Sequence, residues 1–223
     1  MIHIKKSDGA ELHPLLEAAK NKDDAKVYRA GAVYEQIKAD FHEKCYLCED
    51  NELTSIQIEH FEPHKNDLAK KYDWNNLFYS CGHCNAIKGA GFWPLLNCTD
   101  ATDQIGEFIE IRFTPFPKPT IDVQLNQACP KKQEGENTRD LLEKILTGKG
   151  ATSMKIDEAA TLRKKMLRTY NQFTDIIMSR NIEAIRMAIS DKNAFAGMLR
   201  WYLKNDFPQL FEQVMTFPHV APN

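Results

Sequence analysis

Two Cys-x-x-Cys pairs constrain this chain more than any other feature of its sequence: Cys45 with Cys48, and Cys81 with Cys84. Zinc prefers a tetrahedral shell of thiolates, and each Cys-x-x-Cys turn places two sulfurs on one side of such a site. Two turns would complete the shell and leave no open position for water, so the predicted zinc ion is structural. Free thiols or a redox pair are the alternative, but neither explains why two such pairs flank one segment.

The composition is that of an ordinary globular protein and shows no sign of a membrane segment. Of the 223 residues, 43% are hydrophobic, and no apolar run approaches the roughly 18 residues that span a bilayer. Residues 1–6 lack the apolar core of a signal peptide. We therefore expect a cytoplasmic protein with no membrane partner, in which the remaining cysteines, Cys98 and Cys129, are small buried apolar side chains.

The charge of the chain argues mildly against unaided binding of nucleic acid. The formal net charge is −2, whereas non-specific affinity for nucleic acid comes mainly from Lys and Arg side chains that neutralise phosphates. A local basic surface or a partner protein would have to supply that affinity. Two basic groups are candidates for such a surface: Lys65, Lys70, Lys71 and Lys88, and then Arg163, Lys164, Lys165 and Arg168. The second group could follow a phosphate backbone, or it could be the solvated face of a helix.

The segment between and around the cysteine pairs is expected to fold as strand, loop, strand and helix. Apolar residues at helical spacing predict a helix that leads into Cys45. Alternation predicts the first strand, which a proline ends, and a run of apolar residues predicts the second. Glycines start and stop the last helix. The expected elements are a helix over residues 24–43, a strand over 56–60, one or two helical turns over 66–72, a strand over 74–79 and a helix over 82–88.

The rest of the chain is expected to be mainly helical after one strand region. Residues 109–113 alternate as in a strand, but the proline-rich run 114–119 can be neither helix nor central strand and is the best candidate for a boundary. Helical spacing resumes at residue 138, with a C-cap at Gly148, and a last helix ends before Pro208. We divide the chain into an N-terminal helical segment (1–43), a zinc-bearing core (44–92), a strand and loop extension (93–136) and a C-terminal helical region (137–223).

Glu59 and His60 are adjacent at the end of the first predicted strand, so their side chains should point to opposite sides. A neutral histidine can accept a proton from an attacking water. A carboxylate and an amide oxygen suit Mg²⁺, which takes its other ligands from waters and a substrate phosphate. Glu59 and Asn85, which directly follows the last paired cysteine, could supply that pair. These residues indicate metal-dependent hydrolysis of a phosphodiester.

Together these residues resemble the HNH endonuclease family, the His-Me finger or ββα-metal nucleases, in its four-cysteine form. The resemblance covers about residues 44–90, and its motifs occur in the family's order: Cys45-x-x-Cys48, Glu59-His60-x-x-Pro63, Trp74-x-Asn76-Leu77, Cys81-x-x-Cys84-Asn85 and Lys88-Gly89. It implies an α+β fold in which a ββα-metal nuclease core with structural zinc is embedded in a mainly α-helical protein.

The resemblance also implies roles for single residues. His60 would be the general base, and Glu59 would be a ligand of the catalytic metal. Asn85 stands where many members of the family have a final histidine, which favours an oxygen-liganded Mg²⁺ or Mn²⁺ over softer metals. Asn76 would brace the loop between the strands. Lys88 is similar to the family's basic residue near the scissile phosphate, although a plain surface lysine is equally compatible with the sequence.

Two further histidines, His64 and His83, could assist the site, but a loop position and a place in the zinc shell are the simpler interpretations. The family implies an endonuclease with DNA as the expected substrate. Two alternatives remain open. One is a non-catalytic zinc-containing module that binds DNA or protein, with Glu59 and His60 as packing residues, and the other is an HNH-type nuclease that acts on RNA.

A looser resemblance concerns the start of the first cysteine pair, the helix before it and the helical C-terminal end. These features are similar to the HNH subunits of bacterial anti-phage systems, including the Septu nuclease subunit and its retron-associated relatives, in which an ATPase accompanies the nuclease. This resemblance implies a role in antiviral defence, with the helical region after Pro119 docking an ATPase partner that contributes nucleic-acid binding.

Overall fold

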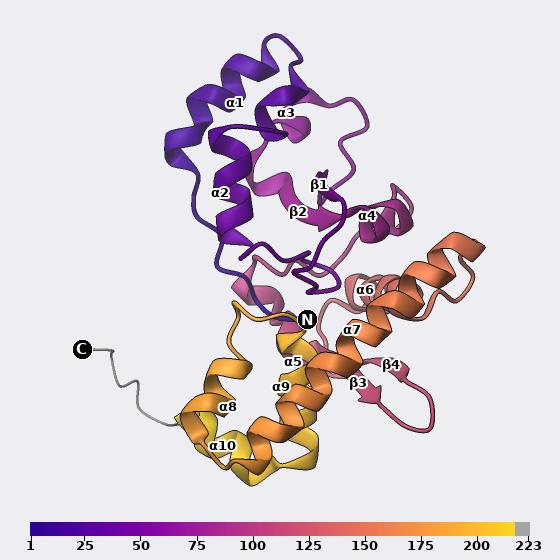
Figure 1. The fold of residues 1–223 in the computed structure, drawn as a ribbon. Helices are drawn as coiled ribbons and strands as arrows, with labels where there is room; N and C mark the ends of the chain where they lie inside the picture. Colours follow the sequence, from indigo (N-terminus) through magenta and orange to yellow (C-terminus); the bar gives the residue numbers. More distant parts are fainter. Residues whose placement is uncertain (217–223) are drawn as a thin grey trace.

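An antiparallel hairpin followed directly by a helix forms the centre of the cysteine-rich segment in the computed structural model, which describes residues 1–216 (Figure 1). Strand β1 (Ile56–His60) pairs with strand β2 (Leu77–Cys81), with Ile56 opposite Cys81 and His60 opposite Leu77. Every residue of β2 is buried. Helix α4 (Gly82–Lys88) begins where β2 ends, so the elements follow the predicted order of strand, loop, strand and helix.

The N-terminal part of the chain covers one side of this hairpin with short helices rather than with the single helix expected over residues 24–43. That prediction is wrong, because Gly31 has a φ of 77° and interrupts the helix. The helical elements of this part are η1 (Ala10–Leu12), α1 (His13–Lys20), η2 (Ala25–Tyr28) and α2 (Ala32–Asp40), and the loop between the strands holds α3 (Leu68–Lys71) and η3 (Trp74–Asn76).

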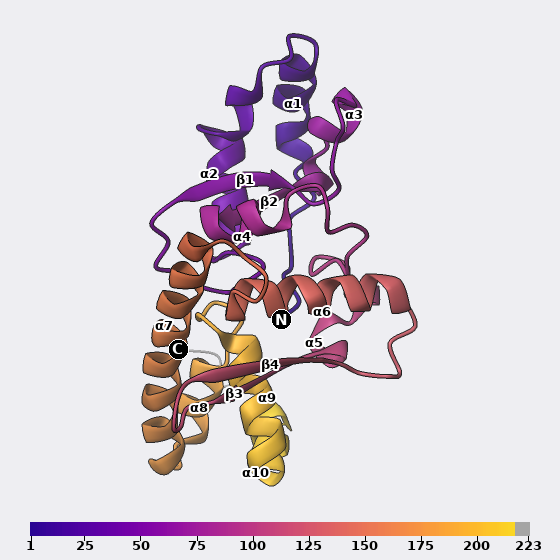
Figure 2. The ribbon, with the colours of Figure 1, turned by 90° about the vertical axis from the view of Figure 1, so that its right-hand side faces the viewer.

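The second half of the chain contains a second hairpin and most of the long helices (Figure 2). The proline-rich run 114–119 is not a boundary: it connects strands β3 and β4, which pair antiparallel with Thr114 opposite Thr120. Helix α10 starts at Pro208 instead of being excluded by it, since proline is well tolerated in a first helical turn. The elements are η4 (Ala101–Asp103), α5 (Ile105–Phe108), β3 (Ile109–Thr114), β4 (Thr120–Leu125), α6 (Lys132–Thr147), α7 (Ser153–Met178), α8 (Ile182–Ala188), α9 (Ala196–Asp206) and α10 (Pro208–Thr216).

One hydrophobic core connects the two halves, with α6 packed against both α4 and β4 and α9 packed against β3. Cys98 and Cys129 lie in this core with 0% and 1% of their surface exposed, which confirms their prediction as buried apolar side chains. None of the described helices is both long enough and apolar enough to cross a bilayer.

The basic residues of α7 dock this helix against the loop that follows the first cysteine pair. Lys165 Nζ lies 2.6 Å from the carboxylate of Asp50, and Arg168 lies 2.6 Å from that of Glu52. Arg163 donates a hydrogen bond to the carbonyl oxygen of Leu146 at 2.7 Å. The helix face that could have followed a phosphate backbone is therefore largely engaged within the protein.

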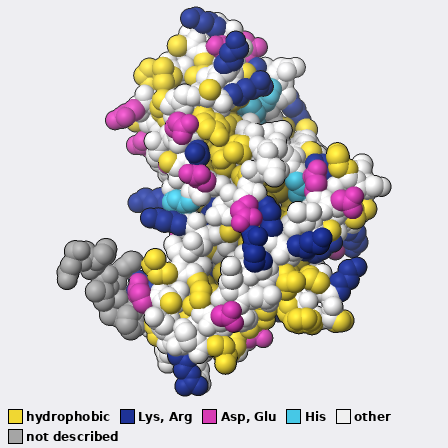
Figure 3. Space-filling view, viewed as in Figure 1, with side chains coloured by type: hydrophobic (Ala, Val, Ile, Leu, Met, Phe, Trp, Pro, Cys, Tyr) yellow, Lys and Arg dark blue, Asp and Glu magenta, His cyan; other side chains and the backbone are white. Residues whose placement is uncertain are grey.

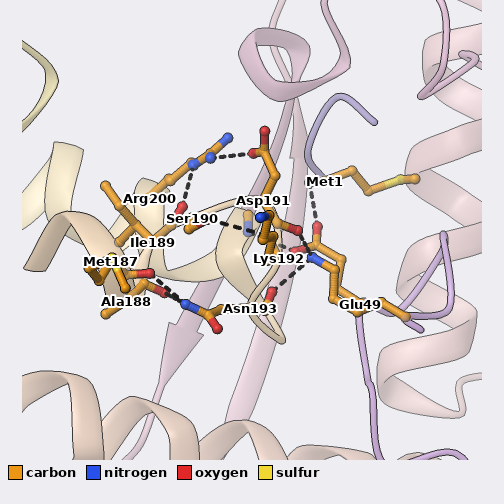
Figure 4. A network of polar contacts seen from close by, with 12 residues as sticks. Met1, Glu49, Met187, Ala188, Ile189, Ser190, Asp191, Lys192, Asn193 and Arg200 are labelled. Carbon is orange, nitrogen blue, oxygen red and sulfur yellow. Dashed lines mark hydrogen bonds and ion pairs between the residues drawn. The ribbon is translucent and has the colours of Figure 1, made fainter. Parts of the chain in front are cut away.

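Glu49, the residue after the first cysteine pair, is buried and anchors the C-terminal helices through a network of polar contacts (Figure 4). Its carboxylate accepts a hydrogen bond from the backbone N–H of Gly197 at 2.8 Å, and its carbonyl accepts one from Phe195 at 3.2 Å. Buried Lys44 donates to the carbonyl oxygens of Asp191 and Asn193 in the loop before α9. The first cysteine pair and the helical C-terminal region are thus coupled parts of one structure.

Substituting Gly197 by alanine is expected to destabilise the protein. A Cβ atom there would lie 2.6 Å from Glu49 Oε1, and overpacking of this kind costs about 1–3 kcal/mol. The gain in helix propensity offsets only about 1 kcal/mol. We expect a lower midpoint in thermal and urea unfolding, whereas Gly91→Ala, with no atom within 4 Å of the added Cβ, should leave the midpoint near that of the parent. A midpoint unchanged by Gly197→Ala would show that this contact is not tight.

Candidate active site

The four paired cysteines come together at one point beside the hairpin. Their sulfur atoms lie within 4.8 Å of one another, with 4.0 Å between Cys48 Sγ and Cys81 Sγ. A tetrahedron of thiolates with Zn–S bonds of about 2.3 Å has edges of roughly 3.8 Å, whereas a disulfide needs about 2.05 Å. The residues therefore fit a zinc ion. Residues 1–216 contain no other group of three or more His, Cys, Asp or Glu side chains with such spacing.

Local backbone geometry helps to arrange these sulfurs. Cys81 is the N-cap of α4, and its Sγ accepts a hydrogen bond from the backbone N–H of Cys84 at 3.4 Å. In the first pair, a turn closes through a hydrogen bond of 2.8 Å from Glu49 N to Cys45 O, with Glu49 at a φ of 61°. The two turns hold the ends of the segment 48–81, which contains β1, the loop and β2.

His60 lies at the end of β1 with one ring nitrogen fixed and the other free. Its Nε2 is 3.0 Å from the carbonyl oxygen of Lys71. Because a carbonyl only accepts hydrogen bonds, Nε2 must carry the proton, and the lone pair is then on Nδ1. Nδ1 has no hydrogen-bond partner within residues 1–216. Burial lowers the pKa of His60 to about 4, so the ring is neutral at pH 7 and can accept a proton.

An open cavity of about 650 Å³ adjoins His60. Its polar and charged lining comes from three separate parts of the chain, whereas its remaining lining is mainly apolar. No carboxylate among the described residues lines it. The molecular face seen in Figure 3, in contrast, carries both basic and acidic side chains. The polar and charged lining residues used below are Arg29, His60, His64, Lys71 and Asn85. The cavity therefore has a net basic lining, which suits a polyanion.

Glu59 and Lys88 form a buried pair on the opposite face of β1 from His60. Only 4% of the surface of Glu59 and 2% of that of Lys88 are exposed. Lys88 Nζ lies 3.4 Å from Glu59 Oε2 and donates to the carbonyl oxygen of His60 at 3.0 Å. The hydroxyl of Tyr46 donates to Glu59 Oε1. Burial raises the pKa of Glu59 to about 7, against the opposing effect of Lys88.

This pair corrects the expected positions of both residues. Lys88 is neither a surface lysine nor placed where a substrate could reach it, because its ammonium group is enclosed between β1 and α4. Its evident action is to hold the backbone of His60 in place. Glu59 does not line the cavity, because alternation along the strand sends it to the side opposite His60.

Asn85, the second predicted ligand of a catalytic metal, does line the cavity. Its amide nitrogen donates to Gln57 Oε1 from the adjacent strand. Glu59 and Asn85 both lie where α4 packs on β1, but the carboxylate of Glu59 contacts Tyr46 and Lys88 instead of Asn85. The structure thus brings His60 and Asn85 to one cavity and leaves Glu59 apart from them.

Asn76 connects both ends of the loop between the strands. Its Oδ1 accepts from the backbone N–H of Glu62 at 2.7 Å, and its Nδ2 donates to the carbonyl oxygens of Glu62 and Lys70 at 3.0 Å each. These bonds fix the chain next to Lys71, whose carbonyl orients His60. Asn76 therefore occupies the place that a loop-bracing residue requires, and its effect on His60 passes through the backbone.

The other two histidines have different surroundings. The ring of His64 lies 4.6 Å from that of His60 by centroids and faces the same cavity, but its Nδ1 accepts a hydrogen bond from Asn66 N at 3.1 Å. His83 contacts the carbonyl oxygen of Ile145 at 3.0 Å and the carboxylate of Glu158 at 2.7 Å. His83 thus connects α4 to α6 and α7 and does not reach the cavity.

Sequence reasoning missed the contribution of the N-terminal segment to this site. Tyr28 is 97% buried, and its ring packs edge-on against His60 with centroids 5.5 Å apart. Arg29, the next residue, lines the cavity. The apolar spacing that placed Tyr28 on a helix face gave no signal for either contact, since both depend on packing between segments far apart in the chain.

The titration of His60 is expected to differ from that of a free imidazole. Because the folded pKa is about 4 and the ordinary value is 6.5, the unfolded chain binds more protons between these pH values. The resulting stabilisation is complete above pH 6.5 and is lost as the pH falls toward 4. NMR of the ring should show neutral His60 at pH 5.5, and Tyr28→Ala, which uncovers the ring, should raise its pKa. Titration near 6.5 in the parent protein would contradict the burial.

Comparison with known proteins gives one match. A family model described as HNH endonuclease matches residues 45–91, whereas no curated protein and no solved structure matches the chain. The matched segment begins at the first paired cysteine and contains every site residue predicted from the sequence. The match supports the predicted family for this segment and a nuclease-type activity. Tyr28 and Arg29 lie outside the matched residues.

Proposed function

We propose that the protein is a metal-dependent HNH endonuclease that hydrolyses phosphodiester bonds in DNA. The observation that carries this proposal is the geometry of His60: its Nε2 is bonded to the Lys71 carbonyl, which leaves Nδ1 free, and the residue lines a basic cavity. A general base needs such a free nitrogen within reach of its substrate. In this proposal β1, β2 and α4 are the ββα-metal core, and the four-cysteine zinc site holds them in register.

The residues of the chain account for the deprotonation step. A water beside Nδ1 of His60 loses a proton to the ring and attacks the phosphorus, and the bond to the leaving oxygen breaks. That oxygen takes a proton from solvent, and His60 later returns its extra proton to solvent. The proton on Nε2 stays on the ring, because the Lys71 carbonyl accepts from it and stabilises the imidazolium that forms. Lys88 and Asn76 act indirectly. Lys88 fixes the backbone of His60, and Asn76 fixes the backbone next to Lys71.

The proposal includes Mg²⁺ or Mn²⁺, and of the two ligands predicted for this ion only Asn85 is placed where it could contribute. The donor set fits in part: Asn85 lines the cavity, but the enclosed Glu59 pairs with Lys88 and Tyr46 and does not reach it. We therefore assign no step of the reaction to the ion. Metal dependence rests on the family match and on the phosphodiester chemistry, in which a divalent ion stabilises charge on the phosphate and the leaving oxygen.

The burial of Glu59 favours one competing function, a zinc-containing module that binds nucleic acid or protein without cleaving it. In such a module the Glu59 and Lys88 pair would be purely structural, as observed. His60 separates the two functions, because a packing histidine has no need for a fixed tautomer with its lone pair beside an open cavity.

Incubation of the purified protein with supercoiled plasmid and with a structured RNA, each with Mg²⁺, Mn²⁺ or EDTA, tests the proposal. We expect nicked or linear plasmid only with a divalent ion. Gel-shift binding of the plasmid without cleavage in any metal would favour the binding module, whereas cleavage confined to the RNA would reassign the substrate. Zinc content is measured on the same preparation, and absence of stoichiometric zinc would contradict the scaffold.

A further part of the proposal concerns biology: the nuclease acts in anti-phage defence beside an ATPase partner bound to the helical region after Pro119. The net charge of −2 supports a need for a partner, because a weakly charged nuclease gains little affinity from phosphate contacts alone. Phage plating on cells that carry the gene with its genomic neighbours, compared with a His60→Ala allele, tests this role. Equal plating on both would exclude a defence function that depends on cleavage.

A further inference from the structure

We infer that Arg29 binds the phosphate backbone of the substrate at the cavity, so that the N-terminal segment is a working part of the site. This inference rests on the proposed nuclease function and goes beyond it, because Arg29 lies outside the segment that matches the HNH model. The carrying observation is that Arg29, which is exposed and has no side-chain partner within residues 1–216, lines the same cavity as His60.

The local structure fixes the position of Arg29. Asp24 starts η2 by accepting a hydrogen bond from Lys26 N at 3.0 Å. Tyr28 then anchors this turn in the interior, where its ring contacts those of His60 and Tyr72 at centroid distances of 5.5 and 5.9 Å. Arg29 follows Tyr28 directly, so its backbone is tied to the histidine through one buried aromatic ring, while its side chain remains exposed.

The charges around the cavity distinguish Arg29 from the other basic residues. Lys71 lies 2.5 Å from the carboxylate of Asp23 and is partly neutralised by it. Arg29 makes no ion pair or hydrogen bond through its side chain within the described part of the chain. A guanidinium group presents a planar fork of donors that matches two phosphate oxygens. Of the cations that line the cavity, Arg29 is thus the one whose charge is available to a ligand.

The position relative to His60 also suits a nuclease substrate. The bond to be cleaved must lie beside Nδ1 of His60, and a nucleic acid strand places a phosphate on each side of that bond. A cation on another wall of the cavity can hold a phosphate without entering the reaction. We therefore assign Arg29 to binding and not to chemistry, which predicts an effect mainly on KM.

The test compares Arg29→Ala, Arg29→Lys and Lys26→Ala in the full chain. Lys26 is the matched control, since it is an equally exposed cation on the same turn but does not line the cavity. We expect Arg29→Ala to raise KM for plasmid or oligonucleotide cleavage about 10-fold with kcat nearly unchanged. Arg29→Lys should recover part of the loss, and Lys26→Ala should change KM less than 2-fold.

A second readout does not depend on cleavage. Binding of a fluorescent oligonucleotide to the His60→Ala protein is measured with and without Arg29→Ala over a range of salt concentrations. Removal of one phosphate contact should lower the slope of log K against log salt by about 0.7–0.9. Equal KM and equal salt slopes for Arg29→Ala and Lys26→Ala, in a protein that cleaves, would overturn the assignment of Arg29 alone. A parent protein that neither binds nor cleaves nucleic acid would overturn the proposed function as well.

Discussion

His60→Ala is expected to lower kcat for phosphodiester cleavage by about 10²–10⁴-fold, the usual contribution of a positioned general base. The loss follows from geometry, because His60 lines the cavity and its Nε2 is bonded to the Lys71 carbonyl, which leaves the lone pair on Nδ1 free. The KM should change little, since the imidazole is neutral and contributes no charge to phosphate binding. Single-turnover cleavage of plasmid, with circular dichroism to verify folding, measures this loss.

His64→Ala is the matched control for this prediction. The two rings face one cavity, but His64 Nδ1 already accepts a hydrogen bond from Asn66 N, so its loss should cost much less. Imidazole added to His60→Gly should restore part of the activity, because the cavity leaves room for a free ring. Equal losses in the two alanine variants, or full activity in His60→Ala, would show that His60 is not the general base. The acid limb of the pH–rate profile should lie near the pKa of about 4.

Much of the hairpin and its four-cysteine cluster could be predicted because the signals are local. A Cys-x-x-Cys turn places its own two sulfurs on one side, and alternation is enough to place β1. An apolar run indicates β2, although this strand begins at Leu77 and not at residue 74. The side to which Glu59 and His60 point also follows from strand geometry. The surroundings of each side chain do not follow from strand geometry. The pairing of Glu59 with Lys88 and Tyr46 depends on how α4 and the first cysteine turn pack on the strand.

The tautomer of His60 shows a second limit of sequence reasoning. The tautomer is determined by the backbone carbonyl of Lys71, whereas the sequence indicated a role only for the charged side chain of this residue. A carbonyl group is present in every residue, so no residue type could have pointed to this contact. Arg29 was missed for a related reason: its segment reaches the site only through the packing of Tyr28 on His60.

The wrong boundary and the divided helix have backbone causes. A proline-rich run forbids helix and central strand, but it is compatible with the loop of a hairpin, as β3 and β4 show. Gly31 was read as part of a helix because apolar spacing continues on both sides of it. Its φ of 77° separates η2 from α2, and Arg29, which lines the cavity, lies between these two elements.

Cys81→Ala is expected to abolish stoichiometric zinc binding and to destabilise the whole chain, not the hairpin alone. Structural zinc sites contribute about 10–16 kcal/mol of binding free energy at pH 7. Loss of even about 5 kcal/mol would lower the melting temperature of a chain of this size by about 10–20 °C. The effect should reach the C-terminal helices, because Asp50 and Glu52 pair with α7, and Glu49 holds the start of α9.

Hydrogen exchange and a matched cysteine variant test this coupling. Cys98→Ala changes another buried thiol, which lies outside the four-cysteine cluster, so this variant should keep its zinc and most of its melting temperature. In Cys81→Ala, or after removal of zinc by a chelator, amides of β1 and β2 should exchange faster, and those of α7 next to Lys165 should follow. Because the fixed position of His60 depends on β1, cleavage should fall in parallel with zinc content. Unchanged protection of α7 after zinc loss would show that the C-terminal helices are held without the metal.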